Sequence, residues 1–128
     1  MYDNSLLDKR VVDARYDGSI YLNLSDGNCI ALEPYGDCCA NCYVQHVDGA
    51  DALVDAVIQN VQDLDCPLTD EDINDGNTCT NAWGHRIITD KGICTIEMRV
   101  VHNGYYGGSL NDRLIKEHQS QAKLLEDF

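Results

Sequence analysis

Glycine-containing turns between short β-rich segments constrain the fold of this chain more than any other feature. Asp17-Gly18 and Ser25-Asp26-Gly27 separate three segments rich in β-branched and aromatic residues, at positions 11–16, 19–24 and 28–32. Glycine accepts the positive φ that tight hairpin turns demand, so an Asp-Gly step between such segments is a strong hairpin signal. The sequence therefore predicts an antiparallel meander of three strands.

A second hairpin is predicted where Asp90-Lys91-Gly92 joins residues 82–89 to residues 93–101. Both segments are rich in strand-forming residues, and we expect the pair to lie at the centre of the sheet. Between the meander and this hairpin, Pro34-Tyr35-Gly36-Asp37 breaks the strand pattern, and residues 38–47 form a buried connector of unassigned type.

Two helices are predicted from the spacing of apolar residues. From Asp51 onward, apolar side chains recur at helical intervals, which indicates a short internal helix that gives way to a strand near Val57. Residues 111–128 carry scattered apolar side chains in a polar segment, a pattern typical of an amphipathic helix. The predicted fold class is α+β: an antiparallel β-sheet meander with one short internal helix and a C-terminal amphipathic helix.

The length of 128 residues predicts a single domain spanning residues 1–128. Within it, residues 65–77 hold most of an aspartate-rich stretch together with Pro67 and Gly76, which indicates an acidic surface loop. No apolar run approaches the roughly 20 residues of a membrane span, and the first residues lack the pattern of a signal peptide. We expect a cytoplasmic protein.

The charge balance disfavours two classes of partner. The chain carries 22 acidic and 9 basic side chains, for a formal net charge of -13. Duplex binding relies on clustered Lys and Arg that neutralise phosphates, and no such cluster occurs. An anionic membrane surface is disfavoured for the same reason. We therefore expect no nucleic-acid partner and no membrane partner.

Seven cysteines are many for this length, and without an export signal we expect free, buried thiols. Cys39 and Cys42 have zinc-like spacing with His46 nearby, but a second pair of ligands is missing. A calcium loop starting at Asp70 fails at its sixth and twelfth positions. A nucleophilic Cys-His pair can always be drawn from so many candidates, which makes that match uninformative. We expect no metal, no cofactor and no catalytic residue.

The most unusual stretch is Asn103-Gly104-Tyr105-Tyr106-Gly107-Gly108. Its glycines let the main chain approach a ligand and turn N–H groups toward anionic oxygens, and its tyrosines could stack on a base. A wide turn with tyrosines packed on a neighbouring element explains the same composition. A cation would favour a ligand site, and Arg113 follows closely, with Arg99 among the other candidates.

In order and spacing, two short motifs resemble those of a family of small phage and prophage proteins. They are Gly36-Asp37-Cys38-Cys39 and the loop from Asn103 to Gly108, with the Thr89–Gly92 hairpin between them. The family looks like the group that contains the first Thoeris anti-defence protein. The resemblance spans roughly residues 11–110, whereas the acidic insertion at 65–77 and residues 116–128 have no counterpart in it.

This resemblance implies a homo-oligomeric sponge that sequesters a cyclic ADP-ribose signal, and for some relatives cyclic oligonucleotides, without cleaving it. Such a protein would act as an anti-defence factor in the cytoplasm of an infected bacterium, with ligand pockets at subunit contacts. Two other functions stay open: a nucleotide hydrolase that uses Cys or His, and an acidic DNA mimic that binds a basic host protein. The expected ligand-binding residues are Asn103, Gly104, Tyr105, Tyr106, Gly107, Arg113, Trp83 and Arg99.

Overall fold

The computed structural model describes residues 6–37, 40–73, 78–103 and 107–128. Within these residues the chain forms β-strands connected by turns and by the short 3-10 helices η2 (Ala50–Leu53) and η3 (Asp70–Asp72). The strands are β1 (Arg10–Tyr16), β2 (Ile20–Leu24), β3 (Cys29–Gly36), β4 (Asn41–Asp48), β5 (Ala56–Leu64), β6 (Cys79–Thr89), β7 (Gly92–His102), β8 (Gly108–Ile115) and β9 (Lys123–Leu124).

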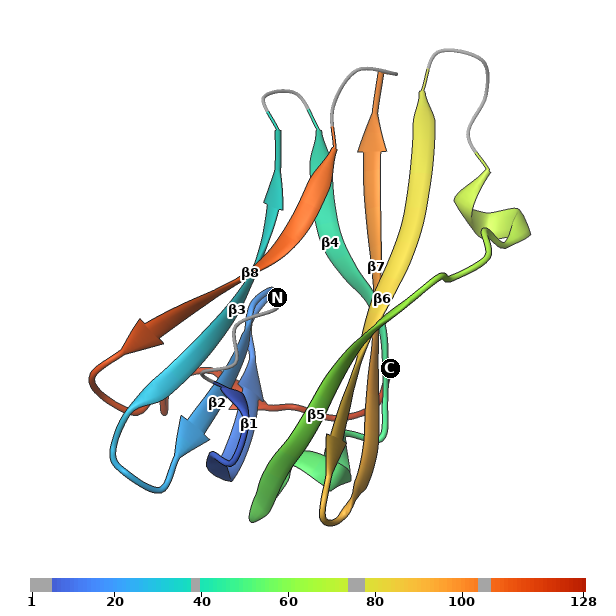
Figure 1. Ribbon diagram of the computed structural model, residues 1–128. Coiled ribbons are helices and arrows are strands. Elements are labelled where there is room, and N and C mark those ends of the chain that lie inside the picture. The colour runs from blue at the N-terminus through green and yellow to red at the C-terminus, as the bar shows by residue number, and fades with distance from the viewer. Residues whose placement is uncertain (1–5, 38–39, 74–77, 104–106) are drawn as a thin grey trace.

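The strands pair antiparallel in the order β4-β7-β6-β5-β1-β2-β3-β8, and β9 lies beside β1. The path bends where β5 meets β1, because these strands share only the pairs Arg10–Val57 and Val11–Ala56. Strands β1, β2, β3 and β8 thus form one layer and β4, β7, β6 and β5 the other (Figure 1). The architecture is a β-sandwich whose two layers are continuous through the β5–β1 contact.

The hydrophobic core lies between the two layers. Alternate residues of each strand point to opposite faces, and the inward set is apolar in both layers. Leu22 and Leu32 from one layer and Ile58, Ile96 and Met98 from the other have no exposed surface. Burial of such side chains stabilises the fold by about 1.5–3 kcal/mol for each residue.

Both predicted hairpin regions are confirmed. Strands β1, β2 and β3 form the three-stranded meander, with register pairs such as Ala14–Leu22 and Leu22–Ile30. Strands β6 and β7 form the second hairpin, paired without interruption from Cys79–His102 to Thr89–Gly92. They occupy the third and second positions of the strand order, so neither lies at an edge. The connector at 38–47 contributes the edge strand β4.

The predicted internal helix is wrong beyond its first turn. Residues Ala50–Leu53 form the single 3-10 turn η2, and the chain enters β5 at Ala56, where the sequence also predicts a strand. Strand β6 offers β5 a pairing partner from Ile58 to Leu64, and these backbone hydrogen bonds replace those of a helix. Tertiary pairing therefore overrides the helical spacing of the apolar residues.

The predicted C-terminal helix over residues 111–128 is wrong. Residues up to Ile115 belong to β8, which pairs with β3 over eight positions, and the described residues contain no α-helix. Of the apolar residues in the helical pattern, Leu110 and Leu125 enter the core, whereas Leu114 and Leu124 are more than half exposed. The fold is mainly β. The edge of β3 forms the backbone hydrogen bonds with β8 that a helix would have formed within itself.

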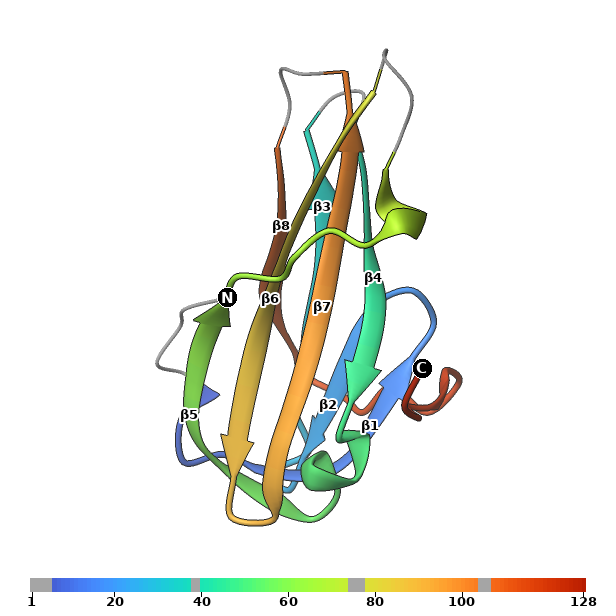
Figure 2. The ribbon, with the colours of Figure 1, turned by 90° about the vertical axis from the view of Figure 1, so that its right-hand side faces the viewer.

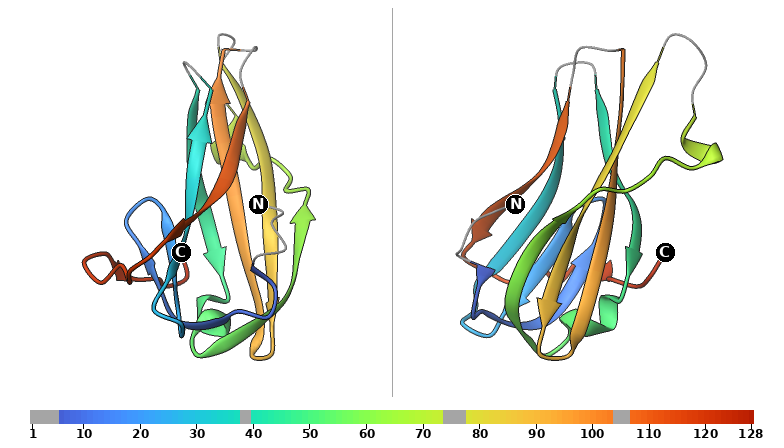
Figure 3. Two further views of the ribbon diagram at one scale, coloured as in Figure 1. Left: turned by 60° about the vertical axis from the view of Figure 1, so that its left-hand side comes forward. Right: turned by 45° about the vertical axis from the view of Figure 1, so that its right-hand side comes forward.

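After β8, residues 116–128, called the tail, cross the molecule from the β8 side to the β4 side (Figure 3). Along this path Lys123 and Leu124 pair with β1 as β9, and Phe128 exchanges two backbone hydrogen bonds with Val47 of β4. The tail therefore joins the two layers. No helix among the described residues is long and apolar enough to span a membrane.

Gly49→Ala should destabilise the fold more than Gly18→Ala, although both glycines have positive φ, of 88° and 105°. A Cβ at Gly18 meets nothing within 4 Å, so its cost is backbone strain of about 1–3 kcal/mol. A Cβ at Gly49 would also collide with the carbonyl oxygen of Ile93. Urea unfolding of both variants measures the difference, and equal losses of stability would contradict this steric account.

Candidate ligand site

The two motifs of the sequence meet at one end of the sandwich, uppermost in Figure 1. Gly36 ends β3 and Gly108 begins β8, and the two residues are directly paired. Just beyond them, the Asp37 N–H donates to the Gly107 carbonyl at 3.0 Å, and the Gly107 N–H donates to Asp37 Oδ2 at 3.1 Å. Asp37 therefore connects the two loops through both its main chain and its side chain.

Packing explains why two positions of the motifs are occupied by glycine. A Cβ at Gly36 would lie 2.6 Å from the Ala40 carbonyl oxygen. A Cβ at Gly108 would lie 2.9 Å from Cys42 Sγ and 3.0 Å from Val100 Cβ, where β8 packs against the opposite layer. Gly107 differs, because its nearest neighbour would be Asp37 Oδ2 at 3.8 Å, an ordinary contact. Packing thus requires Gly36 and Gly108 but not Gly107.

Polar and aromatic side chains line the inner face of the β6–β7 hairpin near this end. Trp83 packs against the core and is partly exposed. His102, nearly buried, lies 3.1 Å from Asn81 Oδ1 through its Nε2. On the facing layers, Cys42 Sγ contacts the Ser109 carbonyl oxygen at 3.6 Å. Aromatic, amide and imidazole groups therefore line this face beside the connected loops.

Arg99, an expected ligand residue, lies on the opposite face of β7. It alternates with the core residues Met98 and Val100, so its side chain points out of the sandwich. Arg99 is nonetheless fully buried, because residues 65–73, called the acidic strap, cross the outer face of β6 and β7 (Figure 2). Gly84 permits this close crossing, since a Cβ there would lie 2.9 Å from Cys66 Sγ.

Asp72 of the strap is the partner of Arg99. Its Oδ1 lies 3.0 Å from Arg99 Nε, and both side chains are 2% exposed or less. Arg99 also donates to the Met98 carbonyl oxygen at 3.0 Å and lies 3.7 Å from Glu97 Oε1. Asp72 Oδ2 accepts hydrogen bonds from the main chain and hydroxyl of Thr69, both at 2.8 Å. The hydrogen bonds to Arg99 and Thr69 hold the Asp72 pKa at about 2.

Arg113 lies on the outer face of the other layer. Its Nε and Nη2 donate to the two carboxylate oxygens of Glu33, at 2.8 and 3.2 Å, in a bidentate pair on β8 and β3. Hydrogen bonding to Glu33 raises the pKa of Arg113, and 60% of its side chain stays exposed. Arg113 lies five positions along β8 from Gly108, which is about 16 Å at 3.3 Å per residue.

The expected ligand residues are therefore only partly brought together in one subunit. Asn103 and Gly107, both exposed, flank the loop, and Trp83 lies on the inner face of the neighbouring hairpin. Arg99 and Arg113 lie on the outer faces of different layers, each paired with a carboxylate. Gly104, Tyr105 and Tyr106 lie outside the described residues.

Four of the described thiols have pKa values raised by burial, which keeps them protonated at neutral pH. Burial raises the pKa of Cys29 to about 11 and that of Cys94 to about 12, and it also raises the pKa values of Cys42 and Cys66. Among the described residues, no group of three or more His, Cys, Asp or Glu is arranged to hold a metal ion. Cys39 of the zinc-like motif lies outside them.

Asp37 and Asp72 have structural roles that the sequence alone does not predict. In the sequence Asp37 is only one residue of the Gly36-Asp37-Cys38-Cys39 motif, and nothing in the neighbouring residues indicates its pairing with Gly107. The acidic composition of residues 65–77 predicts a surface loop, yet Asp72 within it is buried. A signal for Asp72 does exist, because Thr69-x-x-Asp72 has the spacing of a helix capping box, and that box is formed at η3.

A comparison with family models matches residues 4–111 to a family described as "Domain of unknown function (DUF7448)". The match includes both motifs and ends within β8. No curated protein and no solved structure matches this chain.

The buried Asp72–Arg99 pair should give the protein a measurable acid sensitivity. The folded-state pKa of Asp72 lies below its ordinary 3.8, so the pair contributes stability above that value and loses it as pH falls toward about 2. Asp72→Asn should be less stable at neutral pH and should unfold with a shallower pH dependence in this range. Chemical denaturation of both proteins across the range checks this; parallel stability curves would contradict the assignment.

Proposed function

We propose that this chain, which belongs to the DUF7448 family of unknown function, sequesters a cyclic nucleotide signal of the cyclic ADP-ribose type without cleaving it. The observation that supports this proposal is the double contact between Asp37 and Gly107. It joins the two motifs on which the resemblance to cyclic ADP-ribose sponges rests, although they lie 70 residues apart. The ligand would bind at this end of the sandwich.

The groups around the connected loops suit such a ligand. Trp83 offers an aromatic surface for a base, and Asn103 offers an amide for ribose or phosphate oxygens. Main-chain N–H groups of a glycine-rich loop can hold phosphate without a positive side chain. A Cβ at Gly107 would meet only Asp37 Oδ2 within 4 Å, so a ligand can approach the main chain there, while the Gly107 N–H itself already donates to Asp37.

Positive charge to balance the ligand's phosphates must come from a residue other than Arg99, since Arg99 is buried beneath the strap. We propose that the protein is a homo-oligomer in which a neighbouring subunit presents Arg113 to the loops. Arg113 is exposed, and its Nη1 makes no hydrogen bond to Glu33, so the guanidinium keeps donors for a phosphate. Screening over about 8 Å at physiological salt limits repulsion by the acidic surface.

Four of the described thiols, those of Cys29, Cys42, Cys66 and Cys94, favour binding over the alternative of a cysteine-dependent hydrolase. A cysteine nucleophile acts as the thiolate, and pKa values raised by burial keep that form scarce at neutral pH. A sponge needs no nucleophile, because tight reversible binding alone lowers the free concentration of the signal.

A thermal-shift panel of cyclic nucleotides, including cyclic ADP-ribose isomers, tests the proposal. A ligand at a hundred times its dissociation constant should stabilise the fold by about 2.7 kcal/mol. Heating the complex should then release intact ligand in stoichiometric amount, as mass spectrometry would show. Product formed beyond stoichiometry would instead identify an enzyme, and a panel without any shift would refute the nucleotide site.

A pair of matched variants locates the site. Asp37→Ala removes the side-chain contact to Gly107 and should weaken ligand binding at least tenfold. Asp26→Ala is the control, because Asp26 Oδ1 likewise accepts a turn N–H, that of Asn28 at 2.9 Å, at the opposite end of the sandwich. Calorimetric titration of both variants compares them; equal affinities would place the ligand elsewhere.

A further inference from the structure

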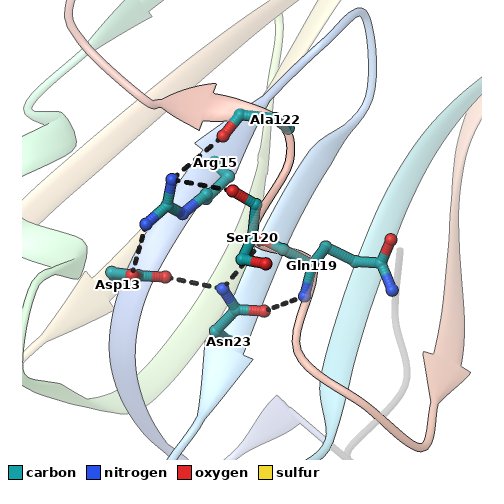
Figure 4. Close-up of polar contacts among 6 residues, drawn as sticks. All are labelled: Asp13, Arg15, Asn23, Gln119, Ser120 and Ala122. Atoms are coloured by element: carbon teal, nitrogen blue, oxygen red, sulfur yellow. Dashed lines mark hydrogen bonds and ion pairs between the residues drawn. The ribbon is translucent and has the colours of Figure 1, made fainter.

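Arg86 differs from the other arginines of this chain, because among the described residues it has no carboxylate partner. Arg15, for example, lies 3.4 Å from Asp13 Oδ2 and also donates to two carbonyl oxygens of the tail (Figure 4). In a chain with 22 acidic side chains, an arginine without such a partner requires an explanation. The arginines that do contact a carboxylate, each at 3.4 Å or closer, are Arg10, Arg15, Arg99 and Arg113.

Arg86 lies in the middle of three polar side chains on the outer face of β5, β6 and β7. The residues on either side of it along β6, His85 and Ile87, are buried and point inward, so Arg86 points outward. Strand register places Gln62 of β5 directly opposite it on one side and Thr95 of β7 on the other. Directly opposed residues of antiparallel strands have Cβ atoms about 4.5–5.5 Å apart. The three side chains, called the polar row, therefore lie side by side.

No side chain of the polar row makes a hydrogen bond or ion pair with another described residue. All three carry donors: guanidinium N–H groups, an amide NH2 and a hydroxyl. The nearest carboxylates on this face are directed or placed elsewhere. Glu97 lies 3.7 Å from Arg99, and Asp48 is two strands from Arg86, about 10 Å at the usual strand spacing. The row thus presents several donors at one place without an acceptor.

The surroundings of the polar row are open, partly apolar and fixed in position. Ile88 and Ile93 are paired on the same face next to the row, and Ile93 is 50% exposed. The acidic strap crosses this face closer to the loop end, and beyond it no described segment covers β6 and β7 (Figure 2). Because β6 and β7 pair without interruption, the strands hold the donors at a fixed spacing.

We propose that the polar row is a binding site for an oxyanion, a phosphate or a carboxylate, on a small molecule whose apolar part contacts Ile88 and Ile93. Arg86 donates two parallel N–H groups to two oxygens of the anion, the geometry that guanidinium groups favour. The Gln62 amide and the Thr95 hydroxyl donate to the same group from either side. A resident carboxylate would compete with this ligand, which explains why Arg86 has none.

This site is separate from the proposed nucleotide site. Arg86 lies seven positions along β6 from Cys79, which is paired with His102 at the loop end, and this is about 23 Å at 3.3 Å per residue. Its side chain also points away from the inner face that carries Trp83. The inference does not rest on the proposed function, and either can fail without the other.

Nuclear magnetic resonance titration of the full-length chain tests the proposal, with inorganic phosphate in one series and acetate in another. Sodium chloride keeps the ionic strength constant, because screening alone changes weak charge contacts. The Arg86 Nε–H and the Gln62 side-chain amide resonances should shift together and saturate in the millimolar range for at least one anion. A response to phosphate alone identifies a phosphate ligand, and a response to acetate alone identifies a carboxylate.

Matched variants locate the binding site. Arg86→Gln should weaken binding of the responding anion at least tenfold, as the Gln62 amide resonance reports. Gln62→Ala and Thr95→Val each remove one donor and should weaken it about threefold. Arg10→Gln is the control, because it makes the same change of charge at an exposed arginine that is paired with Asp55. Its affinity should stay within about twofold of the wild-type value.

Circular dichroism verifies that each variant is folded, and the resonances of the wild-type chain decide the question if one is not. The proposal is overturned if neither anion gives a saturable shift, or if the resonances of Arg10, Arg86 and Arg113 shift equally. Equal affinities of Arg86→Gln and Arg10→Gln would overturn it as well.

Discussion

The antiparallel pairing of β8 with β3 is the constraint on which the rest of the structure depends. It runs without interruption from Gly36–Gly108 to Cys29–Ile115. At its first end it brings the two motif loops within hydrogen-bonding distance, because Asp37 and Gly107 directly follow and precede the paired glycines. At its other end β8 finishes and the tail begins, beside the layer of β1 and β2. One strand pairing thus places both the candidate ligand loops and the start of the tail.

The same pairing explains why the cations of the sequence do not converge. Strand alternation puts Leu110 in the core and Arg113 on the outer face, where Glu33 of β3 lies within reach. Arg99 is placed outward by the same rule on β7 and would be a solvated residue without the acidic strap. Removing one partner of a buried ion pair typically costs about 3–5 kcal/mol, which makes the strap an integral part of this layer. The acidic insertion is therefore anchored at Asp72, while the described carboxylates of Asp65 and Asp70 are exposed to water.

The sequence predicts those parts of the fold that short-range chemistry determines. Both hairpin regions follow from Asp-Gly and Asp-Lys-Gly turns, whose geometry depends on neighbouring residues only. The prediction of a C-terminal helix is wrong because the intervals between Leu110, Leu114 and Leu125 fit a helix. The hydrogen bonds that β8 forms with the edge of β3 favour a strand instead, and no local pattern reveals that pairing. Composition indicates the loop at 103–108 but indicates Asp37 only as part of a motif, since a contact between residues 70 positions apart leaves no trace in either segment. Charge alone indicates Arg113 and Arg99 as candidates. The sheet face on which each side chain lies follows from strand register, which can be derived only after the strands are assigned.

The electrostatics of the described residues bear on how any anionic ligand could be held. Arg15 binds carbonyl oxygens of the tail, Arg99 is paired with Asp72, and Arg113 is paired with Glu33. Of these three, only Arg113 combines an exposed guanidinium with unused donors. A phosphate at the motif loops of a chain with a net charge of -13 must therefore rely on neutral N–H donors, on Arg113 from a second subunit, or on both. Neutral donors carry no charge that needs a counter-ion in the free protein, but the Gly107 N–H already donates to the Asp37 carboxylate, so a phosphate there would use other N–H donors. That arrangement links the two proposals made for this end of the sandwich, because a site built from neutral donors gains most from a cation that arrives with another subunit.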